Sequence, residues 1–119
     1  MYREIKVGKS TVPMLANGAT PIRYRMTFKK DLINEFQKTE GNNYSIATDT
    51  VSELAFIMAK AAEKADMNKL NFEGYIEWCE QFEPFDLTNA MEEIIDMYIG
   101  NIETSSEVKK KAGDAVKDK

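Results

Sequence analysis

The sequence predicts a mainly α-helical domain of the α+β class, in which a short N-terminal β-hairpin precedes about four helices in a small bundle. Short apolar runs separated by a turn open the chain, apolar residues then recur at helical spacing, and this pattern stops after Glu103. The 119 residues, 43% of them hydrophobic, suffice for one domain with one core. We expect a single globular domain over residues 1–103, with the hairpin in 1–16 and the helices in 20–103. A disordered, basic C-terminal tail is expected over 104–119, where too little apolar surface remains to offset the entropy of ordering.

The hairpin is predicted from two strand-like runs, Glu4–Val7 and Thr11–Leu15. Gly8-Lys9-Ser10 between them has the composition of a turn. Pro13 lacks a backbone N–H, so it indicates that the second run is an edge strand.

The first helix is expected to start at Thr20, whose hydroxyl can cap the helix, with Pro21 at the first helical position. Its apolar residues recur at intervals of about four, as on one helix face; they are Met26, Phe28, Leu32, Ile33 and Phe36. Residues 38–43 contain Gly41 and two asparagines, and they are expected to break this helix.

Three further helices are predicted from caps and apolar spacing. Thr50–Glu53 has the capping-box pattern and opens a helix with an apolar stripe narrowed by alanines. Asn71 can cap a third helix that Pro84 ends; its apolar residues are Phe72, Tyr75, Ile76, Cys79 and Phe82. Asp86 can cap a fourth helix, which is expected to end near Gly100.

The charge distribution argues against a nucleic-acid partner. The net charge is −4, but residues 70–107 hold ten acidic side chains and no basic one, whereas residues 1–69 and 108–119 are mildly basic. A duplex-binding protein needs a positive face, and the basic residues of the front are scattered. No apolar run is long enough to span a membrane, and the N-terminus lacks the apolar stretch of a secretory signal, so we expect a cytoplasmic protein without a membrane partner.

The composition also argues against catalysis. The chain contains no histidine, the commonest general base near neutral pH and the commonest metal ligand. Its glycines are isolated, and no calcium-loop spacing occurs. The lone cysteine, Cys79, is expected to be a buried, inert thiol on an apolar helix face. We therefore expect no enzyme, no cofactor and no metal site.

The acidic residues and the tryptophan of the third predicted helix can each be interpreted in two ways, as part of a binding surface or as ordinary structural residues. Glu73, Glu77 and Glu80 lie at helical spacing, and they form either a docking surface for a basic partner or a solvated face. Trp78 lies off the main apolar face, where a core position is favoured over an exposed interface anchor.

Several segments together resemble the tail assembly chaperones of siphophages and prophages of Gram-positive bacteria. The segments that carry this resemblance are Asn17-Gly18-Ala19-Thr20-Pro21-Ile22-Arg23-Tyr24-Arg25, Phe28-Lys29-Lys30-Asp31-Leu32, Glu53–Lys60 and Phe72–Phe82. The similarity covers about residues 1–102, and the Thr-Pro-x-Arg-Tyr-Arg segment is its most specific part. Many family members have glycine near Lys29.

The resemblance implies a phage tail assembly chaperone that binds and solubilises the tape measure protein and promotes tail tube assembly through multivalent contacts. It also implies the tail tube protein as a further partner, action in the cytoplasm of the bacterial host, and absence from the mature virion. The basic front and acidic back further suggest a homo-oligomer with head-to-tail contacts.

Candidate partner-binding residues follow from charge and expected exposure, and not from a motif. They are Arg23, Tyr24, Arg25 and Phe28 on one side and Glu77, Trp78 and Glu80 on the other. The alternative function is a small phage-encoded adaptor or inhibitor that binds a host protein, since it would have the same acidic back half.

Overall fold

The N-terminal hairpin forms as the sequence predicts. In the computed structural model, which describes residues 1–37 and 48–113 and the side chains of 1–36 and 48–100, β1 (Tyr2–Val7) pairs antiparallel with β2 (Ser10–Leu15). Val7 pairs with Ser10, so two residues form the turn, and Gly8 takes a positive φ of 63° that favours glycine. One face of the hairpin is buried, because Ile5, Val7 and Met14 alternate with exposed neighbours.

The structure divides the first predicted helix into two. Helix α1 (Thr20–Phe28) ends where Lys29 adopts a left-handed conformation, with φ 61° and ψ 32°, and α2 (Leu32–Gln37) follows. Pro21 lies in the first turn as expected, but Thr20 does not cap the helix; its Oγ1 accepts a hydrogen bond from the Asn17 N–H at 2.9 Å. The helix break expected at residues 38–43 lies outside the described residues.

Helix α3 (Thr48–Glu63) is the centre of the fold. Every residue from Thr50 to Ala59 is buried. The predicted capping box is wrong, because the helix begins two residues before Thr50 and places Glu53 in its interior. Helices α1, α4 and α5 and strand β2 all pack against α3, which explains why no side of this segment faces solvent.

The acidic helices follow a short connection. A turn of 3₁₀ helix, η2 (Met67–Lys69), leads to α4 (Phe72–Cys79), and Asn71 caps α4 as predicted by accepting a hydrogen bond from the Gly74 N–H at 2.7 Å. Helix α5 (Asp86–Gly113) begins after Pro84 as predicted.

The predicted end of the last helix near Gly100 is wrong, since α5 continues to Gly113. Glutamate, lysine and alanine in this segment are strong helix formers, so helical backbone does not require an apolar face here. Residues 114–119 lie outside the described residues, and the flexibility of 104–119 stays a prediction.

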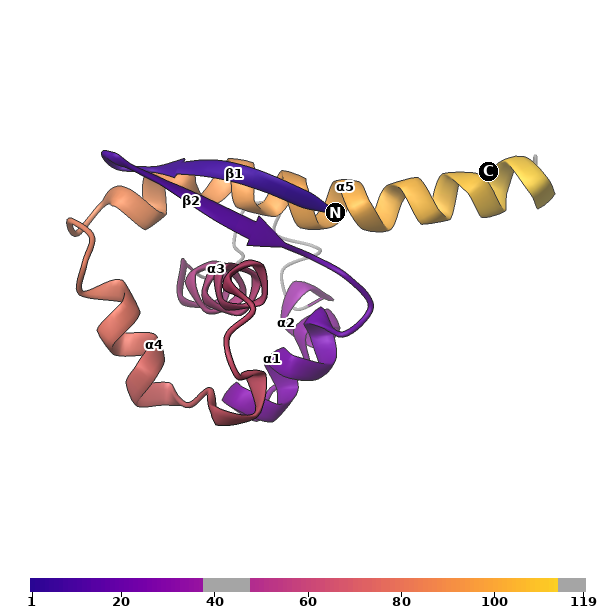
Figure 1. Ribbon diagram of the computed structural model, residues 1–119. Coiled ribbons are helices and arrows are strands. Elements are labelled where there is room, and N and C mark those ends of the chain that lie inside the picture. Colours follow the sequence, from indigo (N-terminus) through magenta and orange to yellow (C-terminus); the bar gives the residue numbers. More distant parts are fainter. Residues whose placement is uncertain (38–47, 114–119) are drawn as a thin grey trace.

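The other elements lie on three sides of α3 (Figure 1). The hairpin and α5 lie on one side of it, α1 and α2 on a second, and α4 on a third, while the end of α5 projects beyond the rest of the molecule. Buried side chains from the hairpin to α5 form one hydrophobic cluster. The predicted fold class, a small mainly helical domain with an N-terminal antiparallel hairpin, is confirmed.

Candidate functional site

The first group of predicted binding residues is split between core and surface. Tyr24 is fully buried and Phe28 is 9% exposed, whereas Arg25 points to solvent. Arg23 lies at the surface, where its Nη1 donates a hydrogen bond to Asn68 Oδ1 at 2.9 Å and so ties α1 to η2. In this conformation Tyr24 and Phe28 stabilise the domain and leave only the two arginines for a partner.

A buried carboxylate explains the position of Tyr24. The Tyr24 hydroxyl donates a hydrogen bond to Glu53 Oε1 at 2.7 Å, and Lys30 Nζ lies 3.0 Å from the same oxygen. Glu53 is only 5% exposed, so these two donors offset the cost of burying its charge. Burial, followed by the hydrogen bond to Glu53, raises the pKa of Tyr24 well above its usual value. The sequence pattern did not reveal this network, because Glu53 was interpreted as part of a capping box at the start of a helix.

The second group is divided in the same way. Trp78 is 6% exposed and its ring packs against Phe56 and Phe82, at centroid distances of 5.8 and 5.1 Å, so the favoured core position is confirmed. Glu77, on α4, and Glu80, directly after it, are both exposed. The predicted acidic surface is therefore present, without Trp78 as an exposed anchor.

An aromatic cluster joins the two groups. The Phe28 ring lies 5.2 Å from the Tyr75 ring and 6.5 Å from the Phe72 ring, measured between centroids. Aromatic pairs at such distances are favourable in edge-to-face geometry. The cluster places the end of α1 next to the beginning of α4.

The outer surfaces of α1 and α4 carry apolar side chains that sequence reasoning had missed. Ile22 and Met26 are 47% and 50% exposed, and Phe72 and Ile76 are 56% and 39% exposed. Each pair is spaced four residues apart and so shares one helix face. Met26 had been predicted on the same apolar helix face as Phe28, and Phe72 and Ile76 among the apolar residues of the third helix. The sequence did contain a sign of these exposed residues, because both helices have more apolar positions than one buried face requires.

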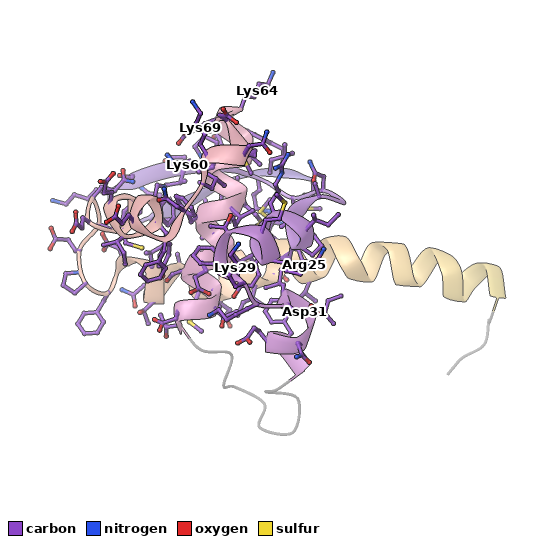
Figure 2. The ribbon with its side chains drawn as sticks, turned by 90° about the horizontal axis from the view of Figure 1, so that it is seen from below. Arg25, Lys29, Asp31, Lys60, Lys64 and Lys69 are labelled. Carbon is purple, nitrogen blue, oxygen red and sulfur yellow. The ribbon has the colours of Figure 1, made fainter. Side chains whose placement is uncertain are left out.

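Basic side chains lie at the surface in two places. Figure 2 shows Lys60, Lys64 and Lys69 at the C-terminal end of α3 and at η2, with Arg25 and Lys29 at the end of α1. Lys60 and Lys69 make ion pairs with Glu63 and Asp66, at 3.5 and 3.9 Å, and Lys60 Nζ also lies 5.9 Å from the centroid of the Phe56 ring. Ion pairs at the surface contribute little to stability.

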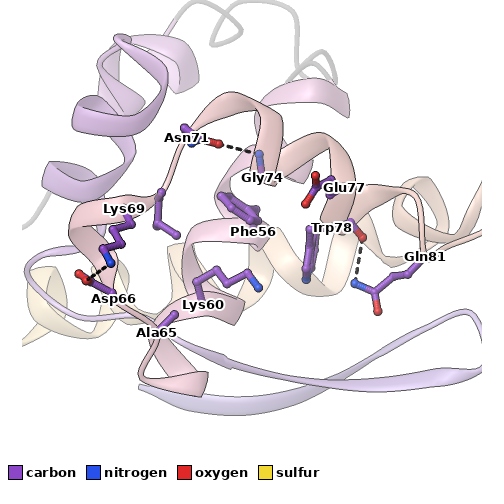
Figure 3. Close-up of a pocket in the computed structure, with 11 residues that line it drawn as sticks. Phe56, Lys60, Ala65, Asp66, Lys69, Asn71, Gly74, Glu77, Trp78 and Gln81 are labelled. Atoms are coloured by element: carbon purple, nitrogen blue, oxygen red, sulfur yellow. Dashed lines mark hydrogen bonds and ion pairs between the residues drawn. The ribbon is translucent and has the colours of Figure 1, made fainter.

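A groove opens between α3, η2 and α4 (Figure 3). Its volume is about 450 Å³, and the rings of Phe56 and Trp78 form its apolar wall. The remaining lining residues are Lys60, Ala65, Asp66, Lys69, Leu70, Asn71, Gly74, Glu77 and Gln81. Two lysines and two acids line it, so the groove has no net charge, and Phe56 and Trp78 are only 1% and 6% exposed.

The remaining reactive group is Cys79, whose thiol is half-buried. Burial raises the pKa of this thiol, which keeps it in the less nucleophilic protonated form. Among the described residues, no three histidine, cysteine, aspartate or glutamate side chains are grouped to hold a metal ion. No helix in the described ranges combines the length and the hydrophobicity needed to cross a bilayer.

Comparison with known proteins finds no matching family model, curated protein or solved structure. The resemblance to tail assembly chaperones therefore stays a prediction.

Proposed function

We propose that this protein is a phage tail assembly chaperone that binds and solubilises the tape measure protein and promotes tail tube assembly. The observation that supports this proposal is the apolar outer surface of α1 and α4, defined by Ile22, Met26, Phe72 and Ile76 and called the α1–α4 surface below. Ordered helices in a small domain usually bury such side chains. Apolar residues kept at the surface on two neighbouring helices are typical of a site that another polypeptide covers.

The chemistry of the α1–α4 surface matches an amphipathic helix. A tape measure protein is a very long helical chain, and its apolar stripes would self-associate if they were left in water. Side chains at i and i+4 on α1 and on α4 offer one apolar row on each helix for such a stripe. Arg25 and Lys29 border one row and Glu73, Glu77 and Glu80 border the other, so charged flanks of the bound helix find partners of either sign.

Multivalency lets each contact remain weak. Many copies along one long target raise the overall binding strength without a large interface per copy. Weak single contacts also allow the chaperone to leave when tail tube protein takes its place. On this proposal the protein acts in the cytoplasm of the bacterial host, forms homo-oligomers on its target and is absent from the mature virion.

Co-expression with the tape measure protein of the same genome tests the proposal. We expect the wild-type chain to raise the soluble fraction of the tape measure protein several-fold, as quantified after centrifugation. The double variants Ile22→Ser/Met26→Ser and Phe72→Ser/Ile76→Ser should each lose most of this effect, because a serine face cannot cover an apolar stripe.

The matched control is Ile33→Ser on α2, which replaces a side chain that is 53% exposed but lies outside the α1–α4 surface. This variant should solubilise the tape measure protein as the wild type does. If the wild-type chain leaves the tape measure protein insoluble, the proposal is wrong and the adaptor or inhibitor function takes precedence.

A further inference from the structure

Strand β1 has an open backbone edge. In an antiparallel pair, residues that bond to the partner strand alternate with residues whose N–H and C=O groups point away from it. Met1 and Ala16 exchange two hydrogen bonds, at 2.6 and 2.8 Å, so the odd-numbered residues of β1 bond to β2. Tyr2, Glu4 and Lys6 therefore direct their backbone groups outward, and within the described residues no other element accepts a hydrogen bond from their N–H groups.

The other edge of the hairpin is blocked by proline. Pro13 lies opposite Glu4, so by the same alternation its nitrogen points outward from β2, where it offers no N–H to a further strand. Proline at such a position protects a sheet edge from pairing. Strand β2 also packs on α3, and β1 lies on the side of the hairpin away from α3 (Figure 1). The edge that the hairpin offers to another strand is therefore that of β1.

Helix α5 packs against the inner face of β1. Ile5 is fully buried on this face, and Arg3, which shares it, lies 3.5 Å from Asp96 of α5. The outer face is open, because Glu4 and Lys6 are both exposed there. A strand laid along the edge of β1 would therefore meet one acidic and one basic side chain on its solvent side.

These two charges select a second copy of β1 as the partner strand. Outward-facing backbone groups bond only to outward-facing groups, so in an antiparallel pair of β1 strands an even-numbered residue always meets an even-numbered one. The register that places Glu4 opposite Lys6 of the second copy also places Lys6 opposite its Glu4, which gives two favourable opposite-charge pairs. Shifting this register by one step in either direction places Glu4 opposite Glu4 or Lys6 opposite Lys6, which is unfavourable. Strand β1 is therefore complementary to itself in one register.

We propose that two copies of this chain pair through their β1 strands, so that the two hairpins form one continuous antiparallel sheet. Glu4 and Lys6 would form two hydrogen-bonded pairs with their counterparts, each exchanging two backbone hydrogen bonds, as in other cases of strand addition to a sheet edge. Both copies use the same surface, so the contact is two-fold symmetric and closes at a dimer. A head-to-tail contact would instead continue beyond two copies. The inference goes beyond the proposed chaperone function and does not rest on it.

Sedimentation of the purified full-length protein tests the contact. The weight-average mass of the wild type should rise with concentration between micromolar and millimolar and level off at two chains. Glu4→Lys and Lys6→Glu each convert both charge pairs into like-charge pairs, so each should raise the dissociation constant by about tenfold or more. Lys64→Glu is the matched control, since it makes the same change of charge at an exposed position directly after α3, and it should dimerise as the wild type does.

An equimolar mixture of Glu4→Lys and Lys6→Glu is the decisive arm. One variant has lysine at both positions and the other has glutamate at both, so the mixed pair has opposite charges at both places and should dimerise at least as tightly as the wild type. Restored association would also show that both variants fold. A wild type that stays monomeric, a mass that keeps rising beyond two chains, a Lys6→Glu variant that associates normally, or a mixture that stays monomeric would each overturn the inference.

Amide exchange measured by NMR tests whether the backbone of β1 forms the contact. The N–H groups of Glu4 and Lys6 should exchange more slowly at concentrations where the dimer forms, because they become hydrogen-bonded. The N–H of Thr11, which faces the other edge of the hairpin, should keep its rate. Equal rates for Glu4 and Lys6 in monomer and dimer would overturn the inference, since association would then use another surface. These experiments contain no tape measure protein, so the solubility assay with the α1–α4 variants tests the chaperone function separately.

Discussion

At the scale of single residues, the buried Tyr24–Glu53 hydrogen bond is the contact most sensitive to substitution. Tyr24→Phe removes the hydroxyl that donates to Glu53 at 2.7 Å and leaves a buried carboxylate with one donor fewer. We expect a loss of about 1–3 kcal/mol in the free energy of unfolding, as measured by urea denaturation. Tyr2→Phe is the matched control, because the Tyr2 hydroxyl meets Glu4 in solvent at 3.3 Å, and it should change stability by less than about 0.5 kcal/mol.

The same substitution has a predicted signature at high pH. Burial raises the pKa of Tyr24 above the ordinary value of 10.0, so above that pH the unfolded chain releases a proton that the native protein keeps. The contribution of Tyr24 to stability is therefore intact below pH 10 and falls above it, by about 1.4 kcal/mol per pH unit. Burial raises the pKa values of Tyr75 and Tyr98 in the same direction.

Above pH 10 the free energy of unfolding of Tyr24→Phe should consequently fall less steeply with pH than that of the wild type, by the slope that corresponds to about one proton. An identical slope for wild type and variant would show that Tyr24 ionises equally in both states.

At the scale of secondary-structure elements, the division between α1 and α2 depends on one strained residue. Lys29 is exposed and has a φ of 61°, a left-handed conformation that is unfavourable for a residue with a Cβ. Lys29→Gly should raise the free energy of unfolding by about 0.5–1 kcal/mol, since the gain in the folded state exceeds the entropy that glycine adds to the unfolded chain. Thermal denaturation would show this as a higher midpoint.

Arg25→Gly is the control four residues earlier, where the backbone is helical. It should lower stability by about 1 kcal/mol, because glycine is a poor helix former. Destabilisation by Lys29→Gly would mean that the helix does not end in this left-handed conformation.

Sequence patterns predicted most elements because each depends on local chemistry. Gly8 supplies the positive φ of the hairpin turn, Asn71 caps α4, and Pro84 separates α4 from α5. The break at Lys29 was not predicted, because lysine is a good helix former and nothing in its own side chain indicates a left-handed backbone. Glu53 was misread for a related reason, since its partners are distant in sequence and only the tertiary fold brings them together.

At the scale of the whole molecule, the binding surface depends on how the helices pack around α3. Periodicity indicated which helices have apolar faces, but it did not distinguish Tyr75, which is buried, from Phe72, which is not. That choice is made by the rotation of α4 against Phe28 and Phe56. The groove was likewise unpredictable, because its lining residues come from three elements. Of the candidate residues, the surface charges were predictable, whereas the exposed apolar residues needed the structure.

Hydrogen–deuterium exchange on the complex with the tape measure protein is the most direct test of how the protein recognises its target. Peptides covering Thr20–Phe28 and Phe72–Cys79 should exchange more slowly in the complex than in the free protein, while peptides from α2 should be unchanged. Protection confined to other elements, or no protection at any concentration of tape measure protein, would contradict binding at the α1–α4 surface.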